Sequence, residues 1–253
     1  MMRVFIFFLI GFLSFQAGAL RVLVDPGHGG IDRGASSGSI HESHLVLQIA
    51  QELSNQLRRD PQFQVSMTRD SDRTLSLPDR VRKAEEFSAD ILISLHANSA
   101  PDRKIQGMEV YFQNQMPLAE ENYYLANVEN QTLVTPNKYS SRLLSKLSDL
   151  NEIVADLERQ GRIKLSLSFA EILRGSWPGS LKQAPFFVLN QSKSAAILIE
   201  VGFLSHPTEA KNLSNPQLQK DLAKRIYESL VKYVAKMRTR KHQALIDSPR
   251  AWE

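Results

Sequence analysis

The chain has 253 residues, of which 31 are Lys or Arg and 27 are Asp or Glu, with 42% hydrophobic residues and no cysteine. The apolar content and the near balance of charge exclude a disordered chain. The absence of cysteine excludes disulfide-stapled folds, thiolate catalysis and cysteine zinc sites, so a metal ion could be held only by His, Asp or Glu. We expect one globular domain at this length, and no nucleic-acid partner, because basic residues are not interleaved with aromatic ones in a stripe.

The first 19 residues have the pattern of a secretory signal peptide. A short basic start, residues 1–3, precedes an almost wholly apolar run over 4–15, and small residues follow at 17–19. About a dozen apolar residues are too few to span a bilayer comfortably. We therefore expect cleavage after Ala19 and export to the periplasm or the cell exterior. An uncleaved membrane anchor is the alternative.

Apolar runs typical of strands alternate with helical patterns along the rest of the chain. Apolar residues recur at helical spacing in three ranges. The first runs from Glu42 to residue 57, the second from Pro78 to about residue 87, and the third over 218–234. This alternation predicts an α/β fold built on one sheet. The predicted strands are 22–24, 63–67, 91–95, 108–112, 186–189 and 197–201.

Two segments stand apart from this alternation. Residues 114–161 are polar at first and then carry a Leu-rich helical pattern, and we interpret them as an insertion. Residues 239–253 are basic and then polar, with no sustained periodicity, and we expect a loose tail there. The predicted domain is therefore 20–238.

Two histidines follow apolar strands. His28 lies in the glycine-rich turn 25–30, directly after the first predicted strand, and His96 lies at the end of the strand predicted over 91–95. Ligand sites of open α/β sheets gather at the carboxyl ends of the strands. A phosphate-binding turn is the weaker interpretation of residues 25–30, because the Lys-Ser/Thr pair of a Walker loop is missing.

Glu200 lies within a third apolar strand, between residues 195–199 and Val201. A carboxylate in such surroundings is costly unless it is paired, metal-bound or protonated, so Glu200 is either functional or neutralised by a basic neighbour. We favour a functional role. Two histidines and one glutamate suit a catalytic zinc with an open position for water, with a second glutamate as proton carrier.

Four segments in chain order carry a resemblance to a known family. They are VDPGHGG at 24–30, TRDSD at 68–72, ADILISLHANS at 89–99 and LIEVGFLS at 198–205. Through them the chain resembles the zinc-dependent N-acetylmuramoyl-L-alanine amidases of the amidase 3 type, over most of its length outside the insertion and the tail.

The resemblance implies roles for individual residues. His28, Glu42 and His96 match the ligands of one zinc ion, and Glu200 matches the catalytic glutamate. It also implies a twisted, mostly parallel sheet with helices on both faces. On its own, Glu42 would be interpreted as an acid favoured at a helix start. Either neighbouring histidine could also replace it as a ligand, and the family pattern is the reason to prefer the carboxylate; these neighbours are His41 and His44.

Asn98 lies two residues after His96 and could orient the substrate or a ligand, or simply form the turn at the strand end. The reaction that the resemblance implies is hydrolysis of the amide between N-acetylmuramic acid and L-alanine in peptidoglycan. Two alternatives remain: a non-catalytic wall-binding module with a structural metal, and a zinc hydrolase that acts on another wall bond.

The insertion is expected to regulate the enzyme, because loops this long are usually functional or disordered. Some periplasmic members of the family carry a helix at the corresponding place that occludes the zinc until an activator protein draws it away. Glu120, Glu121 or Glu129 could fill the open position of zinc. The alternative is that these acids only solvate a surface helix.

Overall fold

The computed structural model describes residues 18–113, 120–131 and 148–247. Six strands form one sheet in the order β4-β1-β5-β8-β6-β7, and all neighbouring pairs are parallel except β6 and β8. The prediction of a mostly parallel α/β sheet is thereby confirmed. The strands are β1 (Leu20–Pro26), β4 (Phe63–Met67), β5 (Ile91–Asn98), β6 (Met108–Phe112), β7 (Gly179–Gln183) and β8 (Ala195–Phe203).

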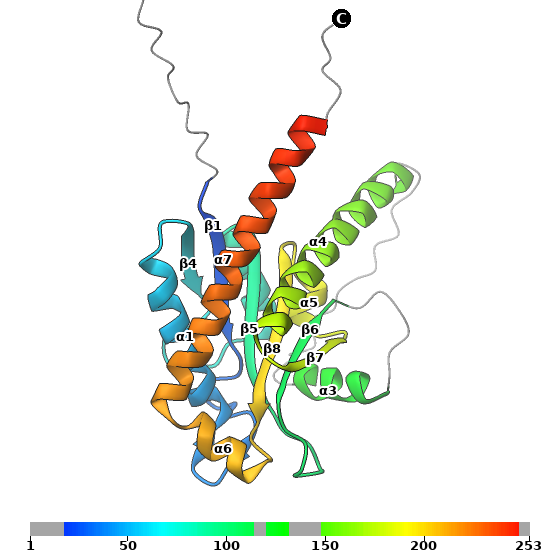
Figure 1. Cartoon of the computed structure of the whole chain (residues 1–253). Coiled ribbons are helices and arrows are strands. Elements are labelled where there is room, and N and C mark those ends of the chain that lie inside the picture. The colour runs from blue at the N-terminus through cyan, green and yellow to red at the C-terminus, as the bar shows by residue number, and fades with distance from the viewer. Residues whose placement is uncertain (1–17, 114–119, 132–147, 248–253) are drawn as a thin grey trace, which may run out of the picture.

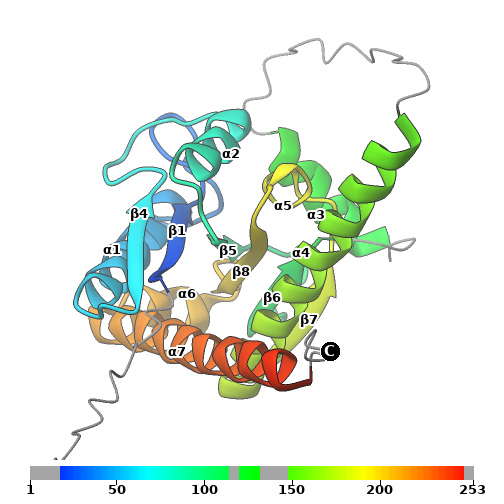
Figure 2. The same cartoon turned by 90° about the horizontal axis from the view of Figure 1, so that it is seen from above.

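Helices cover both faces of the sheet (Figures 1 and 2). On one face α1 (Glu42–Arg58) and the last turns of α4 (Ser148–Ser176) pack beside α7 (Pro216–Asp247). On the other face lie α2 (Leu77–Glu86), α5 (Phe187–Gln191) and the end of α3 (Glu120–Gln131). A short helix, α6 (Pro207–Leu213), follows β8.

The central strands are apolar on both sides because both faces are covered. In β1, Val22 and Val24 point into the core under α1 and α7, whereas Leu23 points into the core under α2 and α5. All three side chains are buried. Their burial on both faces fixes the register of β1 against its neighbours, since a shift by one residue would exchange the two cores.

A small hairpin places the start of α1. Strands β2 (Ser36–Ser37) and β3 (Ile40–His41) pair antiparallel, and α1 begins directly after β3. The backbone amide of Glu42 donates to the carbonyl of Ala35, which ties the first turn of α1 to the loop that precedes the hairpin.

Two expectations are wrong, and one strand was not predicted. Residues 186–189 are not a strand, because α5 covers Phe187–Gln191; a short apolar run does not by itself distinguish a buried strand from a buried helical turn. The edge strand β7 was missed, since its sequence GSLKQ is hardly apolar. The tail expected from residue 239 is helical as far as Asp247, the last residue of α7. Residues 239–247 favour a helix without forming an apolar face.

The insertion also differs from its expected limits. Helix α4 runs through residue 161 without interruption, and its later residues Phe169 and Leu173 are buried in the core. In Figure 1 the first turns of α4 and the last turns of α7 project beyond the sheet. Leu143, Leu144 and Leu147 of the expected Leu-rich pattern lie outside the described residues, as do residues 1–17 of the expected signal peptide.

Candidate metal centre

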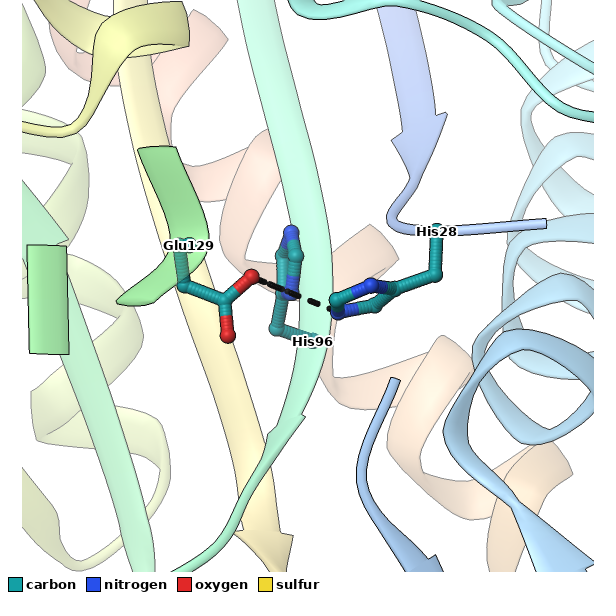
Figure 3. Close-up of side chains that lie close together, drawn as sticks. All are labelled: His28, His96 and Glu129. Atoms are coloured by element: carbon teal, nitrogen blue, oxygen red, sulfur yellow. Dashed lines mark ion pairs between the residues drawn. The ribbon is translucent and has the colours of Figure 1, made fainter. Parts of the chain in front are cut away.

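Four side chains converge at the carboxyl ends of β1 and β5. The Oε1 atom of Glu42 lies 3.1 Å from Nε2 of His28 and 3.0 Å from Nδ1 of His96. The Oε2 atom of Glu129, on α3, lies 3.3 Å and 3.5 Å from the same two nitrogens. Figure 3 shows the two imidazoles and the Glu129 carboxylate facing one another. Segments far apart in the sequence thus bring two nitrogens and two carboxylates to one point.

The His28 ring is oriented by a second carboxylate. Its Nδ1 atom is 2.8 Å from Oδ2 of Asp32, which leaves Nε2 directed at the centre of the cluster. This Nε2 atom is buried, and its close contacts with Glu42 and Glu129 do not have the geometry of a hydrogen bond. Burial lowers the pKa of His28, but Glu42, Asp32 and Glu129 together raise it well above its usual value. An imidazole held by a carboxylate on its far nitrogen is the usual arrangement of a metal-binding histidine.

Two buried arginines hold the turn that carries His28. Arg80 donates to the carbonyls of Pro26 and His28 at 2.8 Å and 2.7 Å. Arg69 donates to the carbonyls of Pro26 and Gly27 at 3.0 Å and 2.6 Å, and also contacts the carbonyl of residue 43 at the start of α1. His28 itself has a φ of 53°, a conformation that few side chains adopt without support. The arginines supply that support.

Asp25 neutralises this network. Its carboxylate accepts hydrogen bonds from Arg80, Thr68 and Ser94 at 2.6, 2.6 and 2.8 Å. Burial raises the pKa of Asp25, but Arg80 and the two hydroxyls lower it more, so the net shift is downward. Asp25 and Arg69 lie in the motifs at 24–30 and 68–72, but a sequence pattern does not predict their supporting role, because a buried basic residue cannot be distinguished from a surface one without knowing the packing.

Glu42 is fixed by two backbone amides. Its Oε1 accepts from the amide of Ala97 at 2.9 Å, and its Oε2 accepts from the amide of Ala35 at 2.8 Å. A Cβ atom at Gly34 would lie 2.5 Å from Oε2, so only glycine fits at that position. Burial raises the pKa of Glu42, but His28 and His96 lower it strongly overall.

The two rival histidines point elsewhere. Nδ1 of His41 lies 3.0 Å from the Ser36 hydroxyl, and the half-exposed His44 pairs with Asp72 at 3.0 Å. Glu42 is therefore the residue of this segment that the structure brings to the two histidines.

Glu200 lies beside the cluster on β8. It pairs in register with His96 of β5 and Glu109 of β6, and its side chain is 1% exposed. Its Oε2 atom makes no hydrogen bond within the described residues. Burial, followed by the nearby charges of Glu42 and Glu129, raises the pKa of Glu200 well above its usual value. A carboxyl group in these surroundings holds a proton more tightly than an exposed glutamate does.

The side chain of Asn98 is hydrogen-bonded to Glu109 of β6. Its Nδ2 donates to Glu109 at 3.1 Å, and its Oδ1 accepts from the amide of Ser99 at 2.7 Å. Glu109 also accepts from Tyr111 and from Lys182, each at 2.6 Å. The side chain of Asn98 is thus engaged within the protein, and an effect on substrate would pass through this network.

Among the three acids considered in the insertion, Glu129 reaches the cluster, with 17% of its side chain exposed. The side chains of Glu120 and Glu121 lie outside the described ones. His28, His96 and Glu129 could each offer one atom to a metal ion, with all three atoms within 4.8 Å of one another.

The residues present fit a zinc ion. The donors are imidazole nitrogens and carboxylate oxygens, which zinc prefers when thiolates are absent. The orphaned Nε2 of His28 and the 3.0–3.1 Å approach of Glu42 to both rings leave donor atoms directed at a common point. Gly27 permits this closeness, because a Cβ atom there would overlap the imidazole of His96.

Known proteins similar to this chain identify its family. The model of the amidase 3 family, described as N-acetylmuramoyl-L-alanine amidase, matches residues 22–232. The chain belongs to this family. Within it, the chain is 31% identical over 229 residues to the N-acetylmuramoyl-L-alanine amidase AmiA of Escherichia coli, covering 86% of this chain and 78% of that protein.

Two further relatives define the extent of the match. A probable N-acetylmuramoyl-L-alanine amidase AmiB of Haemophilus influenzae is 34% identical over 246 residues, which is 90% of this chain but 55% of the relative. The chain therefore spans about half the length of that protein. The crystal structure of an N-acetylmuramoyl-L-alanine amidase from Clostridium difficile superposes with a TM-score of 0.62 at 28% identity, covering 87% of this chain and 98% of the other. The fold is that of the amidase family.

Proposed function

We propose that this protein hydrolyses the amide between N-acetylmuramic acid and the L-alanine of the stem peptide in peptidoglycan, with one zinc ion held by His28, Glu42 and His96. The observation that carries the proposal is the buried carboxyl of Glu200 beside these three donors, whose Oε2 makes no hydrogen bond within the described residues, in a member of the amidase family. A structural metal site has no need of such an acid.

Zinc bound at this cluster would act as a Lewis acid that polarises the amide carbonyl and lowers the pKa of an attacking water to about 7. Asp32 fixes the His28 ring through Nδ1, and the amides of Ala97 and Ala35 fix Glu42, so the donors are oriented before the metal binds. Ordered donors keep the reacting carbonyl in one position.

Glu200 moves the proton. Its carboxylate takes the proton of the attacking water and then delivers it to the departing alanine nitrogen, which cannot leave as an anion. The raised pKa of Glu200 suits the second step, because the carboxyl group retains the proton until the nitrogen accepts it. Asn98, through Glu109, steadies the strand ends beside this residue.

We also propose that α3 restrains the enzyme. Glu129 lies 3.3–3.5 Å from both histidine nitrogens, in a place that the attacking water and the reacting carbonyl group would otherwise enter. Withdrawal of α3 would open the position, and an activator protein acting on the insertion would provide that control. Peptidoglycan and this activator are the partners that the proposal requires.

The contact of Glu129 with the two histidines also supports the alternative of a non-catalytic wall-binding module. With Glu129 the site has four protein ligands, and four protein ligands close a structural zinc site. The variant Glu129→Ala separates the two. If zinc is catalytic, the variant keeps its zinc and its basal hydrolysis rises several-fold; if zinc is structural, the variant loses zinc and stability together. Glu158→Ala, which removes an exposed acid from α4, is the matched control and should change neither property.

Export of the protein also stays a proposal. The sequence pattern over residues 1–19 supports it, and peptidoglycan lies outside the cytoplasmic membrane. Within residues 18–113, 120–131 and 148–247, no helix is both long and apolar enough to cross a membrane.

Product analysis tests the reaction. Purified sacculi are digested with the protein, with and without a chelator, and the products are identified by mass spectrometry. Intact glycan strands together with free stem peptides that begin with alanine are expected, and the chelator should prevent their release. Cleaved glycans, or peptides cut elsewhere, would replace the proposal with a different wall hydrolase.

A further inference from the structure

The residue next to Glu129 makes an unusual pair of contacts. The side-chain amide of Asn130 donates through Nδ2 to the carbonyl of Pro185 at 3.1 Å, and its Oδ1 accepts from the backbone amide of Phe187 at 2.8 Å. Both partners belong to the backbone at the start of α5. One carboxamide thus satisfies the two backbone groups on either side of Phe186.

An extended peptide would form hydrogen bonds with the same two backbone groups. Phe186 has φ −60° and ψ 135°, an extended conformation, so the Pro185 carbonyl and the Phe187 amide point to the same side. In a parallel β pairing, one residue of the added strand donates to the first of these groups and accepts from the second. Peptide recognition by addition to an exposed backbone edge follows the same pattern.

The position of this edge connects it with the cluster. Asn130 and Phe187 line the same cavity as His28, His96 and Glu129. Much of the remaining wall of that cavity is apolar, as expected where a ligand is held by shape with a few polar contacts; it includes Leu75, Leu77, Phe186, Val188 and Leu198.

We propose that residues 129 and 130 imitate the substrate, and that the backbone at Pro185–Phe187 is a subsite for the stem peptide. Glu129 takes the place of the reacting carbonyl group, and the Asn130 carboxamide takes the place of one extended stem-peptide residue near the scissile bond. The subsite binds that residue through its N–H and C=O, not through its side chain. This inference rests on the proposed amidase function.

Attachment of α3 and binding of the substrate therefore exclude each other at two places, the metal cluster and the backbone at Pro185–Phe187. A ligand that offers an extended backbone competes with Asn130 even when it does not reach the metal. Binding of the stem peptide therefore weakens the attachment of α3, in addition to the action of an activator.

The test starts from the full chain with three substitutions combined. Glu129→Ala and Asn130→Ala remove the contacts by which α3 blocks the cavity, and Glu200→Gln prevents turnover. The probe is a synthetic muramyl tripeptide, N-acetylmuramoyl-L-alanyl-D-isoglutaminyl-L-lysine, titrated by calorimetry. Into this background Phe187→Pro is introduced, which removes the backbone N–H. Proline suits the first residue of α5, and the extended Phe186 is compatible with a following proline.

Phe187→Ala in the same background is the matched control, since it removes the ring but keeps the N–H. The proline variant should bind the tripeptide about tenfold more weakly than the alanine variant, the effect of losing one hydrogen bond in a sheltered site. Equal affinities of two variants that melt at the same temperature would overturn the proposal.

A second measurement needs no change at residue 187, and so covers the case in which the proline variant does not fold. Hydrogen exchange of the Phe187 amide in the unblocked background should slow when the tripeptide is added. Exchange that stays fast in the saturated complex would also overturn the proposal. Hydrolysis of sacculi by the protein with Glu200 intact is measured separately, so failure of the subsite is distinguishable from failure of the amidase function.

Discussion

The substitution Asp25→Asn tests how the turn that carries His28 is held. Asp25 is fully buried and accepts three hydrogen bonds, of which the one from Arg80 is 2.6 Å long. Asparagine keeps the shape of the side chain but removes its charge, so the guanidinium of Arg80, itself 3% exposed, loses its counter-ion. Stability should fall, and the His28 turn should loosen with it.

The magnitude follows from the cost of breaking a buried ion pair, about 3–5 kcal/mol when one partner is removed. Arg80 keeps its hydrogen bonds to the carbonyls of Pro26 and His28, so we expect the lower end, about 3 kcal/mol. For a protein of this size each kcal/mol lowers the melting temperature by about 2–4 °C. The expected decrease is therefore about 6–12 °C.

Thermal unfolding of the zinc-loaded protein at pH 7, followed by circular dichroism, measures this change. Asp156→Asn is the control, because Asp156 pairs with Arg159 on the exposed surface of α4 and its loss should not shift the melting temperature. A decrease below 2 °C for Asp25→Asn would refute the reasoning. The pKa of Asp25 is lowered in the folded state, so its contribution is complete above the pKa of the unfolded chain, about 3.9. The difference between wild type and variant should shrink as the pH falls below about 4.

Three further predictions concern the metal, its surroundings and export. Chelation should inactivate the enzyme and added zinc restore it, whereas His28→Ala and His96→Ala should each lose metal and activity together; stoichiometric zinc in either variant, measured by atomic absorption, would contradict the ligand assignment. Gly27→Ala should weaken zinc binding at least tenfold, because its Cβ overlaps the His96 ring. Gly175→Ala should leave zinc affinity unchanged, because the added Cβ has no atom within 4 Å outside the neighbouring backbone of its own helix. Equal zinc affinities of the two variants would refute the close-approach argument. Amino-terminal sequencing of the exported protein should begin at Leu20, and a sequence starting at Met1 would exclude cleavage.

Much of the sheet could be predicted because its strands are buried on both faces and therefore read as apolar runs. Edge strand β7 could not, since the sheet contacts it on one side and its sequence carries no pattern. The apolar run 186–189 predicts a strand where the structure has helix α5, because its few apolar residues are buried by packing against the sheet and have no helical period of their own.

The cluster itself was more predictable than its supports. His28 follows β1 and His96 lies near the end of β5, and the topology brings the ends of neighbouring parallel strands together, so the proximity of the two histidines follows from the fold class. The contacts of Glu129 and Asn130 depend on how α3 folds back over the sheet, which no local pattern specifies. The burial of Arg80 depends likewise on tertiary packing, because the helical pattern around it would equally suit a surface arginine.

The most direct test of the proposed mechanism is the substitution Glu200→Gln. Glutamine has nearly the shape of glutamate but neither accepts nor releases a proton at neutral pH. The variant should keep one zinc per chain and the melting temperature of the wild type, yet release no alanine-terminated stem peptides from purified sacculi. Glu158→Gln on exposed α4 should behave as the wild type. Release of stem peptides by the zinc-loaded Glu200→Gln protein at the normal rate would contradict the role of Glu200 and the mechanism built on it.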